Sequence, residues 1–530
     1  MLRRTELIFL RLPGLWLAVV LTLIVALPGF FTLPPVDRDE ARFAQASAQM
    51  LASGDWVDIR LGDEARHKKP IGIYWLQASV AAVTGAETQI WAYRLVSLLG
   101  ALISVGFTYG IARLVMPKGP SVLAAVALGA CFLLGAEARL AKTDAMLLAA
   151  IMAGQYVIAR MWLPEGRAQR VNLPFGVAMM FWGAQAASIL IKGPIGPMVA
   201  VFTLAGLCAV RRDVAVLRAL RPWRGLAMML VLVLPWFVAI TIRSDGAFWQ
   251  ASVGADMLAK IAQGQENHGA PPGTYLALVW ATFWPGSLVL AAGIPALWRG
   301  GRRAPLVQFA LIWAVPVWIV FELTATKLVH YVLPAYPALA LMAAWALWTA
   351  GPGRTWIAAL LGLVPLAMLA AFAVAAGQVG AGLAWPFWLG VVGLAVAIPL
   401  IVITYRRGAF GGLTVALAGG GLAMSVAVFP SLARMPVLWP APAFARIVAE
   451  NPECDVVLAG YAEPSVIFLT QNRVRFVSAE QALAAMTAMG CHVIGMPVDR
   501  APPALVPFAR IDGLNLGNGK NLSLSVFVTP

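Results

Sequence analysis

Charged residues are scarce in this chain. Only 12% of its 530 residues are Asp, Glu, Lys or Arg, whereas 61% are hydrophobic. Ordinary soluble domains carry about a quarter of their residues as charges and about half as apolar residues. The composition therefore excludes an ordinary soluble protein and is typical of a polytopic membrane protein.

Cysteine and histidine are also rare, with four of each. No cysteine pair has the CxxC spacing, and no spacing typical of a metal site occurs. Cys131 and Cys208 fall within apolar runs, so we expect them to be packing residues. Cys454 and Cys491 each precede a β-like run, and in an oxidising compartment they could pair as a disulfide. The alternative is two buried thiols on non-adjacent strands.

Acidic residues number only 24 against 39 Lys and Arg, which gives a net charge of +15. This surplus could indicate nucleic-acid binding. However, the Lys and Arg residues lie mostly in short loops between apolar runs, where they act as topology signals. We therefore expect no nucleic-acid partner.

Apolar runs of about twenty residues recur up to residue 430, and they predict about thirteen transmembrane helices. The runs lie at 12–33, 91–115, 120–136, 144–162, 174–191, 195–210, 225–242, 274–297, 306–322, 329–349, 355–376, 384–404 and 411–429. The first run lacks a small-residue cleavage site, so we expect a retained anchor rather than a cleaved signal peptide.

An odd number of spans places the two chain ends on opposite sides of the membrane. With the N-terminus in the cytoplasm, every inside loop is basic, as the positive-inside rule requires. The acidic and mixed-sign clusters then lie on the outer face. We therefore expect a multi-pass membrane protein whose chemistry is extracytoplasmic.

The hydropathy falls after Pro430, where short β-like runs alternate with helical ones. Strands are predicted near 454–460, 473–477, 491–496, 509–516 and 522–528, with helices near 464–471 and 479–489. We expect a transmembrane domain over 1–430, with a catalytic outer loop at 34–90, and a small α/β domain outside the membrane over 431–530.

The loop at 34–90 holds the densest charge. Asp37-x-x-Glu40 has capping-box spacing, and apolar residues follow at helical spacing, so we expect an amphipathic helix on the bilayer surface. The segment 71–83 is too short to span and should be re-entrant or interfacial. Asp39 could simply stabilise the helix dipole, and Lys69 could simply face anionic lipid.

Six ordered motifs run through the first 340 residues. They are DEARFA at 39–44, MLASGDW at 50–56, KPIGIYWL at 69–76, LIKGPIG at 190–196, ENHGAPP at 266–272 and KLVHYVLPAYPALA at 327–340. This set resembles the bacterial aminoarabinose (lipid A) transferases and protein O-mannosyltransferases, which are integral membrane glycosyltransferases of the GT-C fold. The resemblance covers most of the predicted transmembrane domain up to residue 340.

The resemblance implies transfer of a sugar from a polyprenyl (undecaprenyl) phosphate donor, with inversion at the anomeric carbon. It implies that Lys69 faces the donor phosphate, a role that suits a lysine because negative charge develops on the leaving group. Asp39 matches the catalytic loop acid, which would orient or deprotonate an acceptor hydroxyl or stabilise charge on the sugar ring. Arg42 would hold Asp39 or the donor.

Further candidate substrate contacts lie on the predicted outer face. They are Arg139, Lys142, Asp144, Lys192, Glu266, His268, Lys327 and His330. The 139–144 cluster could instead be a structural ion pair, and the lysines at 192 and 327 could be snorkelling anchors. Because both lysines lie in motifs that match the family, we expect them to contact the donor phosphate or the acceptor.

The expected acceptor is lipid A or another cell-envelope glycolipid, and the first alternative is a protein. A transporter or flippase would show repeated halves and charges at the bilayer midplane, and the sequence shows neither. We expect the protein to act as a monomer in membrane lipid.

Relatives commonly carry a metal-binding Glu directly before the loop lysine, but here the residue is Lys68. A cation at this position disfavours a tight divalent site, although Glu266 and His268 remain candidate ligands. We therefore predict that no metal is required and that transfer activity survives EDTA. An assay before and after chelation checks this, and inactivation that one divalent ion reverses would contradict it.

Overall fold

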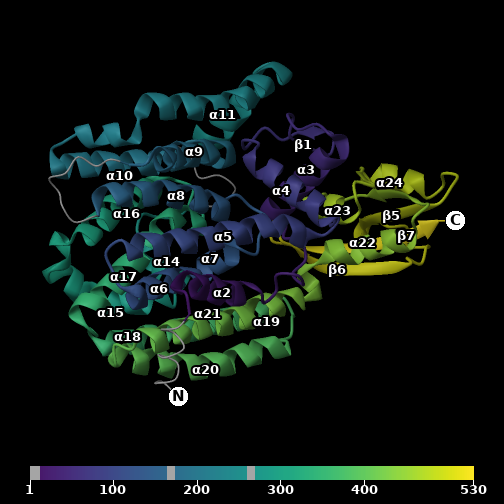
Figure 1. The fold of residues 1–530 in the computed structure, drawn as a ribbon. Coiled ribbons are helices and arrows are strands. Elements are labelled where there is room, and N and C mark those ends of the chain that lie inside the picture. Colours follow the sequence, from purple (N-terminus) through teal and green to yellow (C-terminus); the bar gives the residue numbers. More distant parts are fainter. Residues whose placement is uncertain (1–11, 164–172, 259–268, 530) are drawn as a thin grey trace.

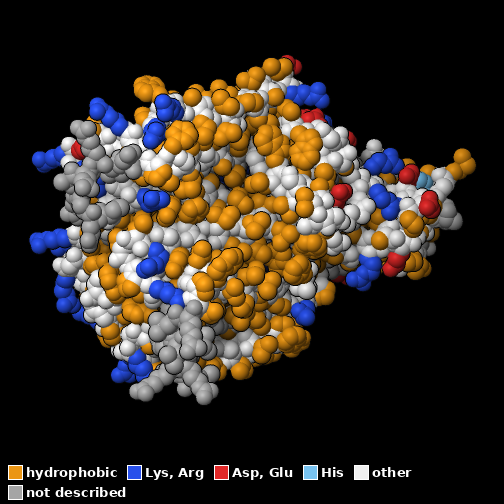
Figure 2. All heavy atoms as spheres, viewed as in Figure 1, with side chains coloured by type: hydrophobic (Ala, Val, Ile, Leu, Met, Phe, Trp, Pro, Cys, Tyr) orange, Lys and Arg blue, Asp and Glu red, His pale blue; other side chains and the backbone are white. Residues whose placement is uncertain are grey.

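The computed structural model describes residues 12–163, 173–258 and 269–529. Most of these residues form helices packed in one bundle, and a small sheet with its own helices projects from one end (Figure 1). Hydrophobic side chains cover much of the bundle surface in Figure 2. On that face, Lys and Arg gather at the end of the bundle away from the sheet, whereas most Asp and Glu lie at the end that carries it.

Nine helices in the described part of the chain are long and apolar enough to cross a membrane, or ten if one bent pair counts as a span. They are α5 (Ile90–Arg113), α8 (Asp144–Trp162), α9 (Phe175–Lys192), α11 (Pro222–Arg243), α16 (Pro305–Leu323), η4 with α17 (Val329–Ala350), α18 with α19 (Thr355–Gln378), α20 (Trp385–Arg406) and α21 (Phe410–Ala433). Helices α2 (Gly14–Ala26) and α10 (Ile195–Arg211) are apolar but shorter. The polytopic helical architecture is confirmed, and the count of thirteen spans is not.

Breaks inside apolar runs account for part of this difference. The predicted span 120–136 consists of α6 (Lys118–Gly129) and α7 (Phe132–Glu137). The predicted span 274–297 consists of α14 (Thr274–Thr282) and α15 (Gly286–Arg299), which meet at 117°. Pro285 lies at that break, where it removes a backbone donor. Hydropathy alone does not reveal such breaks, because the residues on both sides are equally apolar.

The first outer loop contains two helices, α3 (Asp39–Ser53) and α4 (Gly72–Thr84), joined by a hairpin of β1 (Arg60–Leu61) and β2 (Glu64–Ala65). The predicted helices are therefore present. The predicted capping box is wrong, because Arg38 is the N-cap residue of α3 and no side chain caps that helix. Asp37 and Glu40 instead bind distant parts of the chain.

The C-terminal sheet has the strand order β4-β3-β5-β7-β6. Strands β3 (Asp455–Leu458), β4 (Val474–Phe476) and β5 (His492–Pro497) are parallel, whereas β6 (Ala509–Asn515) and β7 (Lys520–Thr529) form an antiparallel hairpin. Helices α22 (Pro440–Glu450), α23 (Pro464–Leu469) and α24 (Ala479–Ala485) lie near the sheet. Apolar side chains fill both of its faces, with Val456 in one core and Val457 in the other. The predicted small α/β domain is thus confirmed.

A disulfide joins Cys454 and Cys491, whose Cα atoms lie 4.6 Å apart. The bond is possible because β3 and β5 are parallel neighbours in which Asp455 is paired with His492. This confirms the predicted pairing. Closing a loop between residues 37 positions apart stabilises the domain by about 3–4 kcal/mol on the chain-entropy model.

A buried ion pair ties the outer loop to the bundle. Arg94 of α5 donates to both carboxylate oxygens of Glu40 in α3, at 2.7 and 2.8 Å, and both side chains are almost fully buried. Arg94 also donates to the backbone carbonyls of Phe30, Leu33 and Pro34. All of the guanidinium nitrogens therefore have partners, as a buried charge requires.

We predict that Arg94→Met destabilises the protein by about 3–5 kcal/mol, because the Glu40 carboxylate would remain buried without its counter-ion. Thermal unfolding in detergent measures the change. Arg60→Met in the same loop is the control, because that side chain is 44% exposed and its loss should matter little. Equal unfolding temperatures for the two variants would contradict the prediction.

Candidate active site

A cavity of about 700 Å³ lies beside the outer loop, among α8, α9, α10, α11, α16 and η4. Most of its lining is apolar. The apolar residues include Leu147, Ile189, Ile195, Met198, Phe237, Phe248, Trp249, Val320, Phe321 and Leu333. The charged and titratable residues that line it are Lys68, Lys69, Asp144, Lys192 and His330. The cavity thus combines a hydrophobic interior with a group of cations, an arrangement that fits an amphipathic anion.

A cluster of ion pairs forms the charged part of the cavity. Lys192 at the end of α9 donates to Asp144 at the start of α8, at 2.5 Å. His330 lies between two carboxylates, with Nδ1 3.4 Å from Glu137 and Nε2 3.7 Å from Asp144. Lys142 donates to Glu137 at 3.1 Å. Side chains from α7, α8, α9 and η4 therefore meet at one point.

Three members of this cluster could hold a metal ion. Ligand atoms of Glu137, Asp144 and His330 lie within 4.8 Å of one another, and the second carboxylate oxygen of Glu137 is buried without a hydrogen-bond partner. However, Lys142 and Lys192 already neutralise the two carboxylates. A divalent ion would add two positive charges without compensation, so the arrangement favours an ion-pair network.

Asp39 is exposed in the first turn of α3, so its carboxylate is accessible to a substrate. Burial by itself would lower the pKa of Lys142, but the carboxylates of Glu137, Asp144 and Asp39 outweigh this effect and raise it. Asp39 therefore lies within electrostatic range of the ion-pair cluster.

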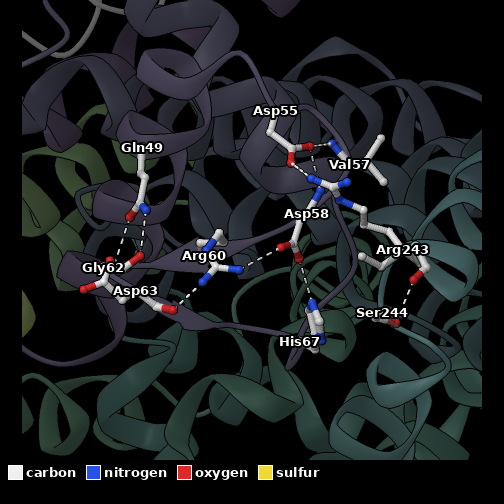
Figure 3. Close-up of polar contacts among 11 residues, drawn as sticks. Gln49, Asp55, Val57, Asp58, Arg60, Gly62, Asp63, His67, Arg243 and Ser244 are labelled. Carbon is white, nitrogen blue, oxygen red and sulfur yellow. Dashed lines mark hydrogen bonds and ion pairs between the residues drawn. The ribbon is translucent and has the colours of Figure 1, made fainter.

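The hairpin of the outer loop holds the segment that carries Lys69. Figure 3 shows Gln49 of α3 bonded to both backbone groups of Gly62 in the turn, at 2.7 and 2.9 Å. It also shows His67 bonded to Asp58 at 2.8 Å, while Asp58 pairs with Arg60. These contacts fix the chain immediately before the two lysines at 68 and 69. Lys69 is half-buried where it meets the cavity.

The structure brings most of the predicted site residues together. Lys69, Asp144, Lys192 and His330 line the cavity, Lys142 belongs to its ion-pair cluster, and Asp39 lies within electrostatic range of that cluster. Lys327 donates to the carbonyl of Thr324, which lines the cavity, at 2.7 Å. Glu266 and His268 lie outside the described residues.

Two predicted site residues have different surroundings. Arg139 is fully buried, donates to the carbonyls of Val25, Pro28 and Gly135, and lies over the ring of Phe429. These contacts favour a structural role over the predicted substrate contact. Arg42 is half-buried, and its charge acts on Asp37 and Glu463 at the boundary with the C-terminal domain.

The sequence reasoning missed Glu137, which joins Lys142 to His330. A signal was present, because an acid at the end of an apolar run is costly to bury and usually has a functional partner. Tyr331 was missed as well. Its ring lies 5.6 Å from the Lys192 ammonium group and lines the cavity.

Comparisons with known proteins agree with this architecture. A family model described as dolichyl-phosphate-mannose-protein mannosyltransferase matches residues 68–238. An undecaprenyl phosphate-α-4-amino-4-deoxy-L-arabinose arabinosyl transferase of Pseudomonas fluorescens is 28% identical over 62% of this chain and 56% of its own length. The same enzyme of Erwinia tasmaniensis is 26% identical over 58% and 54%. The chain thus matches little more than half the length of these relatives.

Among solved structures, ArnT from Cupriavidus metallidurans bound to undecaprenyl phosphate has a TM-score of 0.77. It is 21% identical to this chain, and the match covers 97% of both chains. Fold and cavity therefore define an integral membrane protein of the GT-C fold. Within that fold, the chain is similar to aminoarabinose transferases and mannosyltransferases, in agreement with the resemblance seen in its sequence motifs.

Proposed function

We propose that this protein is an inverting glycosyltransferase that moves a sugar from a polyprenyl (undecaprenyl) phosphate donor to lipid A or another cell-envelope glycolipid. The cavity is the observation that carries the proposal. Its apolar walls suit a polyprenyl chain, and Lys68, Lys69 and Lys192 supply positive charge for a phosphate. The names of the related enzymes and of the ArnT complex describe the same donor chemistry.

The reaction needs a cation to stabilise the leaving phosphate and a carboxylate near the sugar and the acceptor, and we assign these roles to Lys69 and Asp39. The bond between the anomeric carbon and the phosphate oxygen breaks, and the phosphate leaves with negative charge that Lys69 stabilises. The acceptor oxygen attacks from the opposite face of the sugar, which inverts the anomeric configuration. When the acceptor is a hydroxyl, its proton passes to Asp39. When it is a phosphate, no proton has to be removed and Asp39 stabilises positive charge on the ring.

We also propose the orientation of the protein in the bacterial inner membrane. Basic residues occupy the last turns of α5, α8 and α20, namely Arg113, Arg160 and Arg406. In Figure 2, Lys and Arg gather at the end of the bundle away from the C-terminal domain. The positive-inside rule assigns that end to the cytoplasm. The N-terminus would then be cytoplasmic, and Asp39, the cavity cations and the C-terminal domain would face the periplasm.

A protein acceptor is the second candidate, because the matching family model describes mannosyl transfer to protein. An assay of the purified protein with radiolabelled undecaprenyl-phosphate sugars separates the two candidates. Label transferred to lipid A supports the first, and label transferred only to peptides supports the second. Absence of transfer to either acceptor from every donor would contradict glycosyl transfer.

We predict that Lys69→Ala abolishes transfer while membrane insertion and folding are retained, because the side chain supplies charge rather than packing. Arg500→Ala is the control, because it removes an exposed cation of the C-terminal domain that does not line the cavity. Activity is measured with equal amounts of folded protein. A Lys69→Ala variant that works at the full rate would contradict the phosphate role.

For Asp39→Asn we expect a loss of at least about 10²-fold in turnover on a hydroxyl acceptor, the range for removal of a general base. The loss should be smaller with a phosphate acceptor, which needs no deprotonation. Parallel assays with the two acceptor types measure the difference. Near-normal turnover of the variant on a hydroxyl acceptor would remove Asp39 from the mechanism.

A further inference from the structure

The C-terminal domain holds the chain immediately before α3. The carboxylate of Asp37 accepts hydrogen bonds from the backbone N–H of Ser465 at 2.9 Å and from its hydroxyl at 2.7 Å. A longer bond of 3.4 Å comes from the hydroxyl of Tyr461. Residues 424 to 428 positions away along the chain therefore anchor a side chain only two residues before Asp39.

Opposite charges meet at the same boundary. Burial raises the pKa of Asp37, while the Ser465 hydrogen bonds and the charge of Arg42 act against this increase. Glu463 of the C-terminal domain interacts with Arg38 and Arg42 of the loop. Two carboxylates and two guanidinium groups thus form a cluster that spans loop and domain, and it includes an arginine of the DEARFA motif.

Apolar contacts extend this junction. Phe468 of α23 packs edge-on against Tyr93 of α5, with ring centroids 5.5 Å apart, and it belongs to a buried cluster with Ala44 of α3. Helix α23 is therefore seated on both α3 and α5, beside the first outer loop (Figure 1). Because Asp39 is exposed, its position follows from the backbone at the start of α3 rather than from its own packing.

We infer that Asp37 is a positioning residue and that the C-terminal domain, through Ser465 and Glu463, sets the geometry of Asp39 and Arg42 for transfer. The C-terminal domain then contributes to catalysis without contacting the reacting atoms, because it positions the first outer loop that carries Asp39 and Arg42. This inference rests on the proposed function for its kinetic test, whereas its structural test is independent of activity.

The kinetic test compares matched variants. Asp37→Asn and Ser465→Ala weaken the anchor, whereas Asp512→Asn and Ser523→Ala weaken a similar serine–aspartate bond on the exposed β6–β7 hairpin. We expect kcat to fall about 10-fold or more for the first pair, because a displacement of about 1 Å can cost up to 10²-fold. KM for the donor and the affinity for undecaprenyl phosphate should not change, since the cavity lies elsewhere. The control pair should retain normal kcat.

Turnover is expressed per binding site for undecaprenyl phosphate, so that loss of folded protein does not count as loss of catalysis. The double variant Asp37→Asn/Ser465→Ala should be no slower than the slower single variant, because both substitutions break one interaction. A kcat per binding site equal to that of the controls, or fully additive losses, would overturn the inference.

Amide hydrogen exchange tests the anchor without any activity. In the Asp37→Asn and Ser465→Ala variants, amides at the start of α3 should exchange at least about 10-fold faster, and in the two controls they should not. Unchanged exchange would overturn the inference. If the wild-type protein transfers no sugar but the exchange result holds, the proposed function fails while the anchoring of α3 by Asp37 stands.

Discussion

The buried ion pair between Arg94 and Glu40 is the constraint on which the arrangement of the outer loop depends. Neither charge has access to water, so each needs complete hydrogen bonding, and this requirement ties the position of α3 to that of α5. Arg94 donates to the carbonyls of Phe30, Leu33 and Pro34, which follow α2, and Glu40 accepts a hydrogen bond from the backbone N–H of Ala141. One ion pair thus fixes three segments that carry site residues.

Pairing of opposite charges also explains how charged side chains are stable within a largely apolar cavity. Lys142 and Lys192 each contact a carboxylate, and His330 lies between the two acids. In a low-dielectric environment such pairs hold their geometry firmly, because separating them would expose uncompensated charge. Lys69 reaches the cavity from the outer loop instead.

The C-terminal domain adds a second level of organisation. A disulfide joins the residues that immediately precede the neighbouring strands β3 and β5 of its sheet, and α23 is the next element after β3. That helix carries Ser465 and Phe468, which bind the loop by hydrogen bonds and by packing. A rigid sheet is a suitable support for this purpose, because a site held by fixed elements loses less geometry to thermal motion.

Much of the architecture was predictable from the sequence alone. Long apolar runs favour helices through their local composition, although two of the predicted runs are divided by breaks that hydropathy does not reveal. The motifs at 69–76, 190–196 and 327–340 indicated a resemblance to known transferases, and each contributes residues to the lining of one cavity. The matching positions of Cys454 and Cys491 before two predicted strands indicated a possible disulfide, and the structure decided it by making those strands parallel neighbours.

Tertiary structure alone decided the partners of the charged residues. Glu40 fitted a capping box by spacing, yet it binds Arg94, 54 positions away, and Asp37 binds Ser465, 428 positions away. Arg139 is enclosed by backbone carbonyls, whereas Glu137 joins the cluster at the cavity. Hydrophobic periodicity is a local property that each segment carries by itself. Charge pairing depends on which segments meet in space, and in this chain those segments are far apart in the sequence.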